Sequence, residues 1–177
     1  MSTKFAGNNI RGQVNVGKSN ALLLGDLVEL DDINSTGGPG FNTRYSGLKQ
    51  TARWVRNDSG GTLVPGHTVT YKTNSFGTLL GAQSAADVSF HGIIDPDIST
   101  ATVADQDEFL LFIEGPCLAI VSAAITVDEI TSSGSGKVKG VATTEVPSAY
   151  ALEDGTSKVD TDTMRIYLLC ESNIELA

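Results

Sequence analysis

The chain has 177 residues, of which 40% are hydrophobic and 19% are charged, and its formal net charge is −9. It is long enough to bury a core and too apolar for a disordered chain. The first residues, MSTKFAGNN, lack the apolar core of a secretory leader, and no run approaches the roughly 18 apolar residues of a membrane span, so we expect a soluble protein without a membrane partner.

Charge divides the chain into two parts. Residues 1–56 carry seven Lys and Arg against four acidic residues, whereas residues 57–177 carry five against seventeen. Binding to a phosphate backbone depends on clustered Lys and Arg, so the acidic second part argues against a nucleic-acid partner. The basic first part either docks on an acidic surface, its own body included, or is simply solvated.

Residues 1–50 predict an extended N-terminal arm. FAGNNIRGQVNVGKSN and DDINSTGGPGFNTRYSG are polar and glycine-rich, and only ALLLGDLVEL at 21–30 is apolar enough to form a strand. Such a stretch cannot close a core alone, and ordering it is costly unless it lies along its own body or a partner. We therefore expect an arm with one strand at 1–50 and a β domain at 51–177.

Residues 12–19, GQVNVGKS, match the G-x-x-x-x-G-K-[ST] pattern of a phosphate-binding loop. That chemistry needs a buried strand before the first glycine and, after the serine, a helix whose N-terminal amides face the phosphates. Here the polar MSTKFAGNNIR precedes the motif, and Gly25 interrupts the run that follows it. The alternation of strands and helices that builds a parallel sheet is also missing. We therefore predict no nucleotide cofactor and interpret Lys18 as a contact with a partner's surface.

From residue 51 onward, short apolar or alternating runs separated by Gly, Pro, Asn, Asp and Ser indicate a β protein. TARWVR and HTVTYK are typical of half-buried strands, whereas FLLFI and IYLLC are apolar throughout, which is typical of strands covered on both faces. Further strands are expected in VSFHGII, CLAIVSAAITV, GKVKGV and SAYALED, with a hairpin tip in TSSGSGKVKG. The prediction is an all-β fold, a compact antiparallel β-sandwich or barrel-like domain with at most one or two short helices.

NDSGGTLV at 57–64 is close to the GDSGG signature around the nucleophile of chymotrypsin-like proteases. In that family the His and the Asp precede the serine, but the two histidines of this chain, His67 and His91, both follow Ser59. Without a general base the hydroxyl is not activated, so the motif predicts a turn and not a catalytic site.

Metal sites are also disfavoured. The two histidines have no second ligand at metal-binding spacing, and the five acidic residues between 95 and 108 lack the glycine-centred spacing of a calcium loop. A solvated acidic loop is expected there, with loosely bound Ca²⁺ as the alternative, and we predict no metal and no cofactor. Cys117 and Cys170 each lie inside an apolar run, which indicates two buried thiols more than a disulfide.

Several phrases together resemble a known family. RWVRNDSGGTLVPGHTVTYK, FHGIIDPDI, EFLLFIEGPCLAIVSAAI and ITSSGSGKVKG resemble successive strands of the head decoration, or cement, proteins of tailed bacteriophages. The closing AYALEDGTSKVDTDTMRIYLLC resembles their terminal hairpin, with Ser148 or Ala149 where that family has Gly. The resemblance implies a compact β domain, commonly trimeric, that binds the outside of the capsid where coat subunits meet and clamps the expanded shell.

The combined expectation is a non-enzymatic capsid decoration protein on the exterior of the virion, present in the host cytoplasm during assembly. Its expected partners are the major capsid protein and further copies of itself in a homotrimer. We expect the 21–30 run to add a strand to a neighbouring sheet. The residues predicted to contact the capsid or a neighbour are Lys4, Arg11, Lys18, Leu22, Leu24 and Arg44.

The alternatives are another phage β protein, such as a tail tube, fibre or head-closure component, and a β-rich hydrolase with an unrecognised site. A carbohydrate-binding module is disfavoured because the chain has a single Trp and only 6% aromatic residues.

Overall fold

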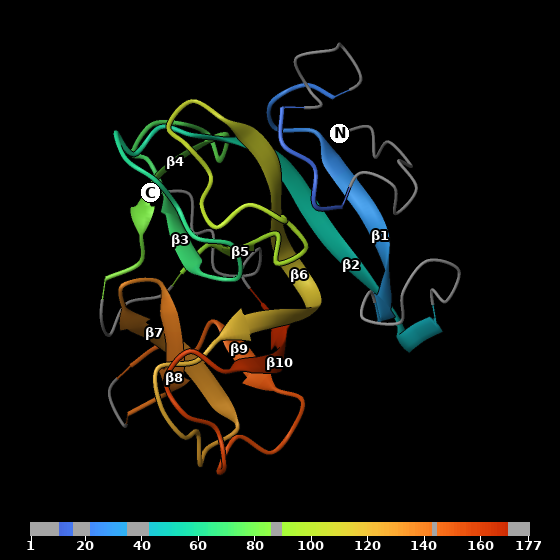
Figure 1. Ribbon diagram of the computed structural model, residues 1–177, viewed down its shortest axis with the longest axis vertical. Coiled ribbons are helices and arrows are strands. Elements are labelled where there is room, and N and C mark those ends of the chain that lie inside the picture. The colour runs from blue at the N-terminus through green and yellow to red at the C-terminus, as the bar shows by residue number, and fades with distance from the viewer. Residues whose placement is uncertain (1–10, 16–21, 35–42, 86–89, 143–144, 170–177) are drawn as a thin grey trace.

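The computed structural model describes residues 11–15, 22–34, 43–85, 90–142 and 145–169, and every helix-or-strand element in these ranges is a strand (Figure 1). The prediction of an all-β, barrel-like fold is therefore confirmed. The ten strands are β1 (Leu27–Asn34), β2 (Thr43–Asn57), β3 (Thr68–Tyr71), β4 (Leu79–Gln83), β5 (Gly92–Ile94), β6 (Glu108–Ile120), β7 (Glu129–Gly134), β8 (Lys137–Gly140), β9 (Ala149–Ala151) and β10 (Thr163–Leu168).

Strand β6 belongs to two halves of the molecule. Its first part, up to Glu114, pairs with β2 and β5, and its second part, from Gly115, pairs with β10. Gly115 has a φ of +91°, and a Cβ atom at this position would collide with the backbone carbonyl of Lys49. A glycine is therefore required where β6 passes from the upper to the lower half of the molecule (Figure 1).

The first half is a closed ring of strands. β2 pairs with β4, β4 with β3, β3 with β5 and β5 with β6, and the pairing of β2 with β6 closes the ring. The β2–β4 pair is parallel, because β3 lies between these strands in the sequence and supplies the crossover that parallel neighbours need. The interior is filled by Val55, Leu63, Val69, Leu80, Ile94, Ile98, Val103, Phe109, Leu111 and Ile113.

The second half is also barrel-like. Its strands follow the order β6, β10, β9, β7, β8, and a bridge between Val121 and Val138 brings β8 back to the end of β6. Its core contains Cys117, Ile130 and Ile166, and it continues under β1 and β2 to include Trp54. One apolar cluster therefore joins the second half to the outer face of the first.

The apolar run FLLFI explains how β6 serves both cores. Phe109, Leu111 and Ile113 point into the ring of the first half, whereas Leu110 and Phe112 point into the larger cluster. All five side chains are at most 1% exposed, which confirms the prediction of a strand covered on both faces. Burying a side chain of this size contributes about 1.5–3 kcal/mol, so this strand is a main source of stability for both halves.

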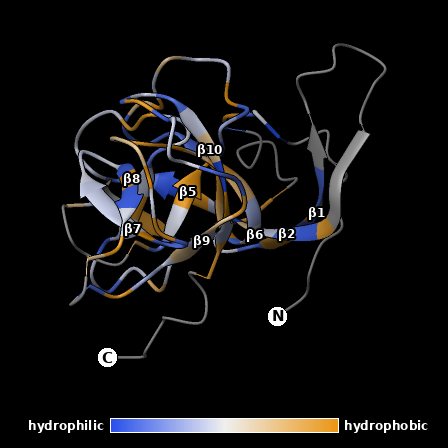
Figure 2. Ribbon diagram, turned by 90° about the horizontal axis from the view of Figure 1, so that it is seen from below, coloured by the Kyte–Doolittle hydropathy of each residue, from blue (hydrophilic) through white to orange (hydrophobic). Residues whose placement is uncertain are grey.

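Strand β1 forms a long antiparallel pair with β2 at the side of the molecule, and it lies outside the ring that β2 helps to close (Figure 2). The predicted strand at 21–30 begins only at Leu27, because residues 22–26 form a turn around Gly25, whose φ is +89°. The strand predicted to begin at residue 51 begins at Thr43, since pairing with β1 extends it. Residue 50 therefore lies inside β2, and the division of the chain there stays a prediction.

Candidate interaction surface

The glycine-rich motif at 12–19 begins along the edge of β6. Val14 forms an isolated bridge with Phe109, and the Gly12 amide donates a 2.6 Å hydrogen bond to the carboxylate of Asp95. This amide is thus used by the protein's own body, and the described part of the motif combines a turn at Gly12, a single bridge at Val14 and a bend at Asn15. Lys18, the residue interpreted as a partner contact, lies outside the described residues.

Ser59 has the contacts of a turn residue. Its hydroxyl donates to the side-chain oxygen of Asn57 at 2.7 Å, and the Ser59 amide donates to the same oxygen at 3.1 Å. His67 contacts the Gln83 amide at 3.1 Å, and Nδ1 of His91 accepts the Tyr71 amide at 3.3 Å. Burial lowers the pKa of both histidines. The structure therefore does not pair Ser59 with a histidine base, and the motif forms the predicted turn.

Arg11 is held inside its own chain. Its Nη2 donates to Oε1 of Gln50 at 2.5 Å, its Nε lies 3.4 Å from a carboxylate oxygen of Asp97, and its guanidinium lies 5.1 Å from the ring centre of Phe112. Only 8% of the side chain is exposed. The basic first part of the sequence thus docks on the acidic second part at this point, which is one of the two alternatives that the charge division left open.

Asn15 fixes the other end of this segment. Its amide donates to the Glu108 carbonyl at 2.6 Å, its side-chain oxygen accepts the Glu108 amide at 3.1 Å, and its side-chain nitrogen donates to Asp107 at 2.9 Å. Asn15 has a φ of +65°, a conformation that asparagine tolerates better than most residues. Residues 11–15 therefore lie against the body in a single defined register.

Asp95 lies beneath residues 11–15 and has no exposed surface. Burial raises its pKa to about 6, while hydrogen bonds from the amides of Gly12 and Asp97 act in the opposite direction. Cys117 is buried as predicted, and burial also raises the pKa of its thiol. Cys170 lies outside the described residues.

The structure describes the side chains of only two of the remaining predicted contact residues, Leu22 and Leu24. Leu22 is 3% exposed and packs into the larger core, with Leu24 half-buried against it. Lys4 and the side chain of Arg44 lie outside the described part of the structure. Leu23, which the prediction omitted, is 64% exposed.

Four turns meet at one end of the first half, and we call them the turn platform: residues 22–26, 57–61, 72–78 and 104–107. They meet because β2 ends where β4 and β6 begin, so that Arg56 pairs with both Leu79 and Glu108. The Gly25 turn touches the 72–78 turn, since a Cβ atom at Gly25 would lie 3.1 Å from a methyl carbon of Thr78. Segments distant in sequence thus form one continuous surface.

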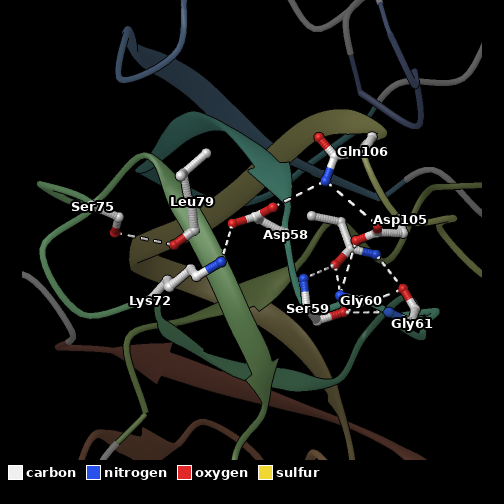
Figure 3. A network of polar contacts seen from close by, with 10 residues as sticks. Asp58, Ser59, Gly60, Gly61, Lys72, Ser75, Leu79, Asp105 and Gln106 are labelled. Carbon is white, nitrogen blue, oxygen red and sulfur yellow. Dashed lines mark hydrogen bonds and ion pairs between the residues drawn. The ribbon is translucent and has the colours of Figure 1, made fainter.

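A polar network connects three turns of the platform, at residues 57–61, 72–78 and 104–107 (Figure 3). Lys72 forms an ion pair with Asp58, and the Gln106 side chain donates to Asp58 at 3.0 Å and to Asp105 at 3.4 Å. The Gly60 amide donates to Asp105 at 3.0 Å. The hydrogen bonds from Lys72 and Gln106 lower the pKa of Asp58, so its carboxylate stays charged at neutral pH.

Beneath the platform, a buried carboxylate ties β2 to β6. Glu108 is 5% exposed and accepts hydrogen bonds from Nε1 of Trp54 at 3.1 Å and from Nη2 of Arg56 at 2.7 Å. Because these donors satisfy the buried charge, the underside of the platform is rigid. The sequence pattern around Trp54 carries no signal for this bond.

Two general properties of the described residues are relevant to the site. Among them, no helix is long and apolar enough to cross a membrane. In the same ranges, no three His, Cys, Asp or Glu side chains converge as a group that could hold a metal ion.

The fold and this surface define an all-β protein of two barrel-like halves that share one strand. The fold is similar to the crystal structure of the N base of gp8.5, the head fibre of bacteriophage phi29, with a TM-score of 0.50 and 11% sequence identity. The similarity covers 67% of this chain and 93% of that one, and at this identity it shows a shared fold. No protein-family model and no curated protein matches the sequence.

Proposed function

We propose that the chain is a non-enzymatic structural protein of a bacteriophage head that attaches to the outer surface of the shell. The observation that carries this proposal is the fold it shares with the base of a phage head fibre. The order of sequence phrases that resembles the head decoration proteins supports the same class of protein, and it is independent of the fold.

The proposed partner is the major capsid protein, at the junctions between coat subunits, and the proposed assembly is a homotrimer without nucleic acid. The acidic balance of residues 57–177 supports an outward-facing, soluble body. Many copies, each with a modest contact, hold a shell together because their attachments act jointly.

Within the arm, Lys4, Lys18 and Arg44 are the proposed rim contacts with coat or with an adjacent copy. Arg11 and Leu22 belong to the same predicted set, but in the single chain both side chains pack against their own body. We therefore place the reach of the arm with the residues on either side of 11–15.

A second candidate, the base of a head fibre, is favoured by the same structural likeness. The two candidates differ in stoichiometry. A decoration protein covers the shell at many equivalent junctions, whereas a fibre base occupies fewer sites and supports an extended fibre. Counting bound copies per shell by quantitative mass spectrometry separates these two roles.

The proposal is tested by mixing the purified protein with expanded and unexpanded shells of the major capsid protein from the same phage. We expect saturable cosedimentation with expanded shells and none with shells of an unrelated phage. Absence of binding to both forms, at low and at physiological salt, contradicts the proposal. Light scattering of the free protein is expected to give three subunits, and rings or tubes of many subunits favour a tail component instead.

A further inference from the structure

The turn between β3 and β4 presents an aromatic side chain to solvent. Phe76 is 96% exposed, more than any other large apolar side chain that the structure describes, and its φ is +52°. Burial of such a side chain is favourable, and folding of the single chain does not gain that contribution here. The left-handed backbone is also unfavourable for a residue with a side chain. Burial of Phe76 against a partner would recover the first of these costs.

The turn holds Phe76 in a fixed position. The Ser75 amide donates to the Lys72 carbonyl at 3.1 Å, and both the amide and the hydroxyl of Thr78 donate to the Ser75 carbonyl, at 3.1 and 2.6 Å. The Ser75 hydroxyl donates to Leu79 at 3.2 Å (Figure 3). Gly77 has a φ of +72°, and a Cβ atom there would meet Nη1 of Arg53, so a side chain at this position would be strained and would displace the end of that arginine. An aromatic residue on so constrained a turn loses little entropy on binding.

The surroundings of Phe76 have the composition of an interface rim. The next turn of the platform carries Leu23, 64% exposed, and the neighbouring turns carry the carboxylates of Asp58 and Asp105. Lys72 neutralises Asp58 in part, and the Asp105 charge is held at the surface by the Gly60 amide. An apolar centre inside a polar rim is the arrangement of residues that dominate binding energy. Carboxylates in the rim select a partner surface with Lys or Arg at the matching positions.

We propose that Phe76 is a docking anchor, which inserts into an apolar socket with a basic rim on a partner protein, with Leu23 as a secondary contact. This inference rests on the proposed function, in which that partner is the outer surface of the coat shell. It assigns the turn platform, and not the outer edge of β1, as the face of the protein that turns toward the shell.

The test compares single substitutions in the full-length protein by cosedimentation with expanded shells. Phe76→Ser is expected to weaken binding at least tenfold, and Leu23→Ser less. Phe76→Trp is expected to retain most of the affinity. The matched control is Val159→Ser, because Val159 is 63% exposed but lies in the second half, between β9 and β10. Added salt is expected to weaken wild-type binding, since the rim contact is ionic.

A loss of binding by either variant cannot be attributed to misfolding, because the exposed side chains of Phe76 and Val159 contribute little to the core. Thermal unfolding is expected to be the same for both variants and the wild type. If Phe76→Ser and Val159→Ser bind the shells equally well, the assignment of Phe76 as the docking anchor is wrong, while the proposed function stands. If the wild type does not bind the shells, the proposed function itself is wrong. If Phe76→Ser instead lowers the subunit count in light scattering, the socket lies on a second copy and the assignment to the shell is overturned.

Discussion

Replacing Gly115 with alanine is the most direct test of how β6 joins the two halves. Gly115 has a φ of +91°, so the left-handed conformation costs an alanine there roughly 1–2 kcal/mol. Its Cβ would also collide with the Lys49 carbonyl and lie 3.1 Å from the Gln50 Cα, and both are backbone atoms of β2 that cannot rotate away. Moving that strand weakens at least one ladder hydrogen bond, worth about 0.5–1.5 kcal/mol. The expected loss of unfolding free energy is therefore about 1.5–3.5 kcal/mol, before any wider repacking.

Substitutions at two other glycines separate the cost of the left-handed backbone from the cost of the collision with β2. Gly60 has a φ of +75°, but no atom lies within 4 Å of the place that a Cβ would take, so Gly60→Ala is expected to cost only the conformational part, roughly 1–2 kcal/mol. Gly61 also has open space and no left-handed φ, so Gly61→Ala is expected to change stability by less than about 1 kcal/mol. Together the three variants distinguish backbone strain from the collision with β2.

Urea denaturation followed by Trp54 fluorescence measures all three variants. With a slope of about 2 kcal/mol per molar urea, the Gly115→Ala midpoint is expected to fall by about 1–2 M. The reasoning is refuted if Gly115→Ala unfolds within about 0.5 kcal/mol of Gly60→Ala, since the close approach of β6 to β2 then carries no cost.

Three further predictions concern buried groups and the arm. Burial raises the pKa of Asp95 to about 6, so the folded state is most stable where this carboxyl is protonated, below about pH 4, and it loses that stability as the pH rises through 6. The free energy of unfolding should therefore fall by up to about 3 kcal/mol between pH 4 and pH 7. Urea titrations at the two pH values measure this fall, and Asp95→Asn should abolish it. Deleting residues 1–20 is expected to weaken shell attachment and to lower the melting temperature, because the contacts of residues 11–15 are lost. Deleting residues 1–10, which keeps those contacts, should lower the melting temperature less, and an equal fall for both deletions contradicts this. In a Cys170→Ser background, Cys117 should react with a thiol reagent only on unfolding, and rapid labelling of the native protein would show that the site is open.

The all-β fold could be predicted because the residue pattern of most strands indicates which of their faces are buried. FLLFI has no polar residue, so it can only be covered on both faces, and the structure places it between two cores. The strand at 79–83 escapes prediction because LLGAQ is short and contains a glycine, and because it is stabilised by neighbours on both sides. The strand at 129–134 overlaps the predicted hairpin tip, since EITSSG is mostly polar, although its Ile130 is fully buried.

The candidate surface was less accessible to sequence reasoning, since it depends on which turns the topology brings together. Arg11 was expected at the exposed rim because it lies in a polar segment, but Asp97 and Gln50, far away in the sequence, provide it with buried partners. A signal for Phe76 did exist: an aromatic residue stands between Ser75 and Gly77, in a stretch that favours a turn and leaves a large side chain with nothing to cover it.

The sharing of β6 also has a mechanical consequence. A load applied to one half of the molecule passes to the other along the covalent backbone of a strand that is clamped in two cores, instead of across a domain linker. Neither half can be pulled open without extracting side chains from the other, so the protein should resist stretching as a single unit and yield in one step.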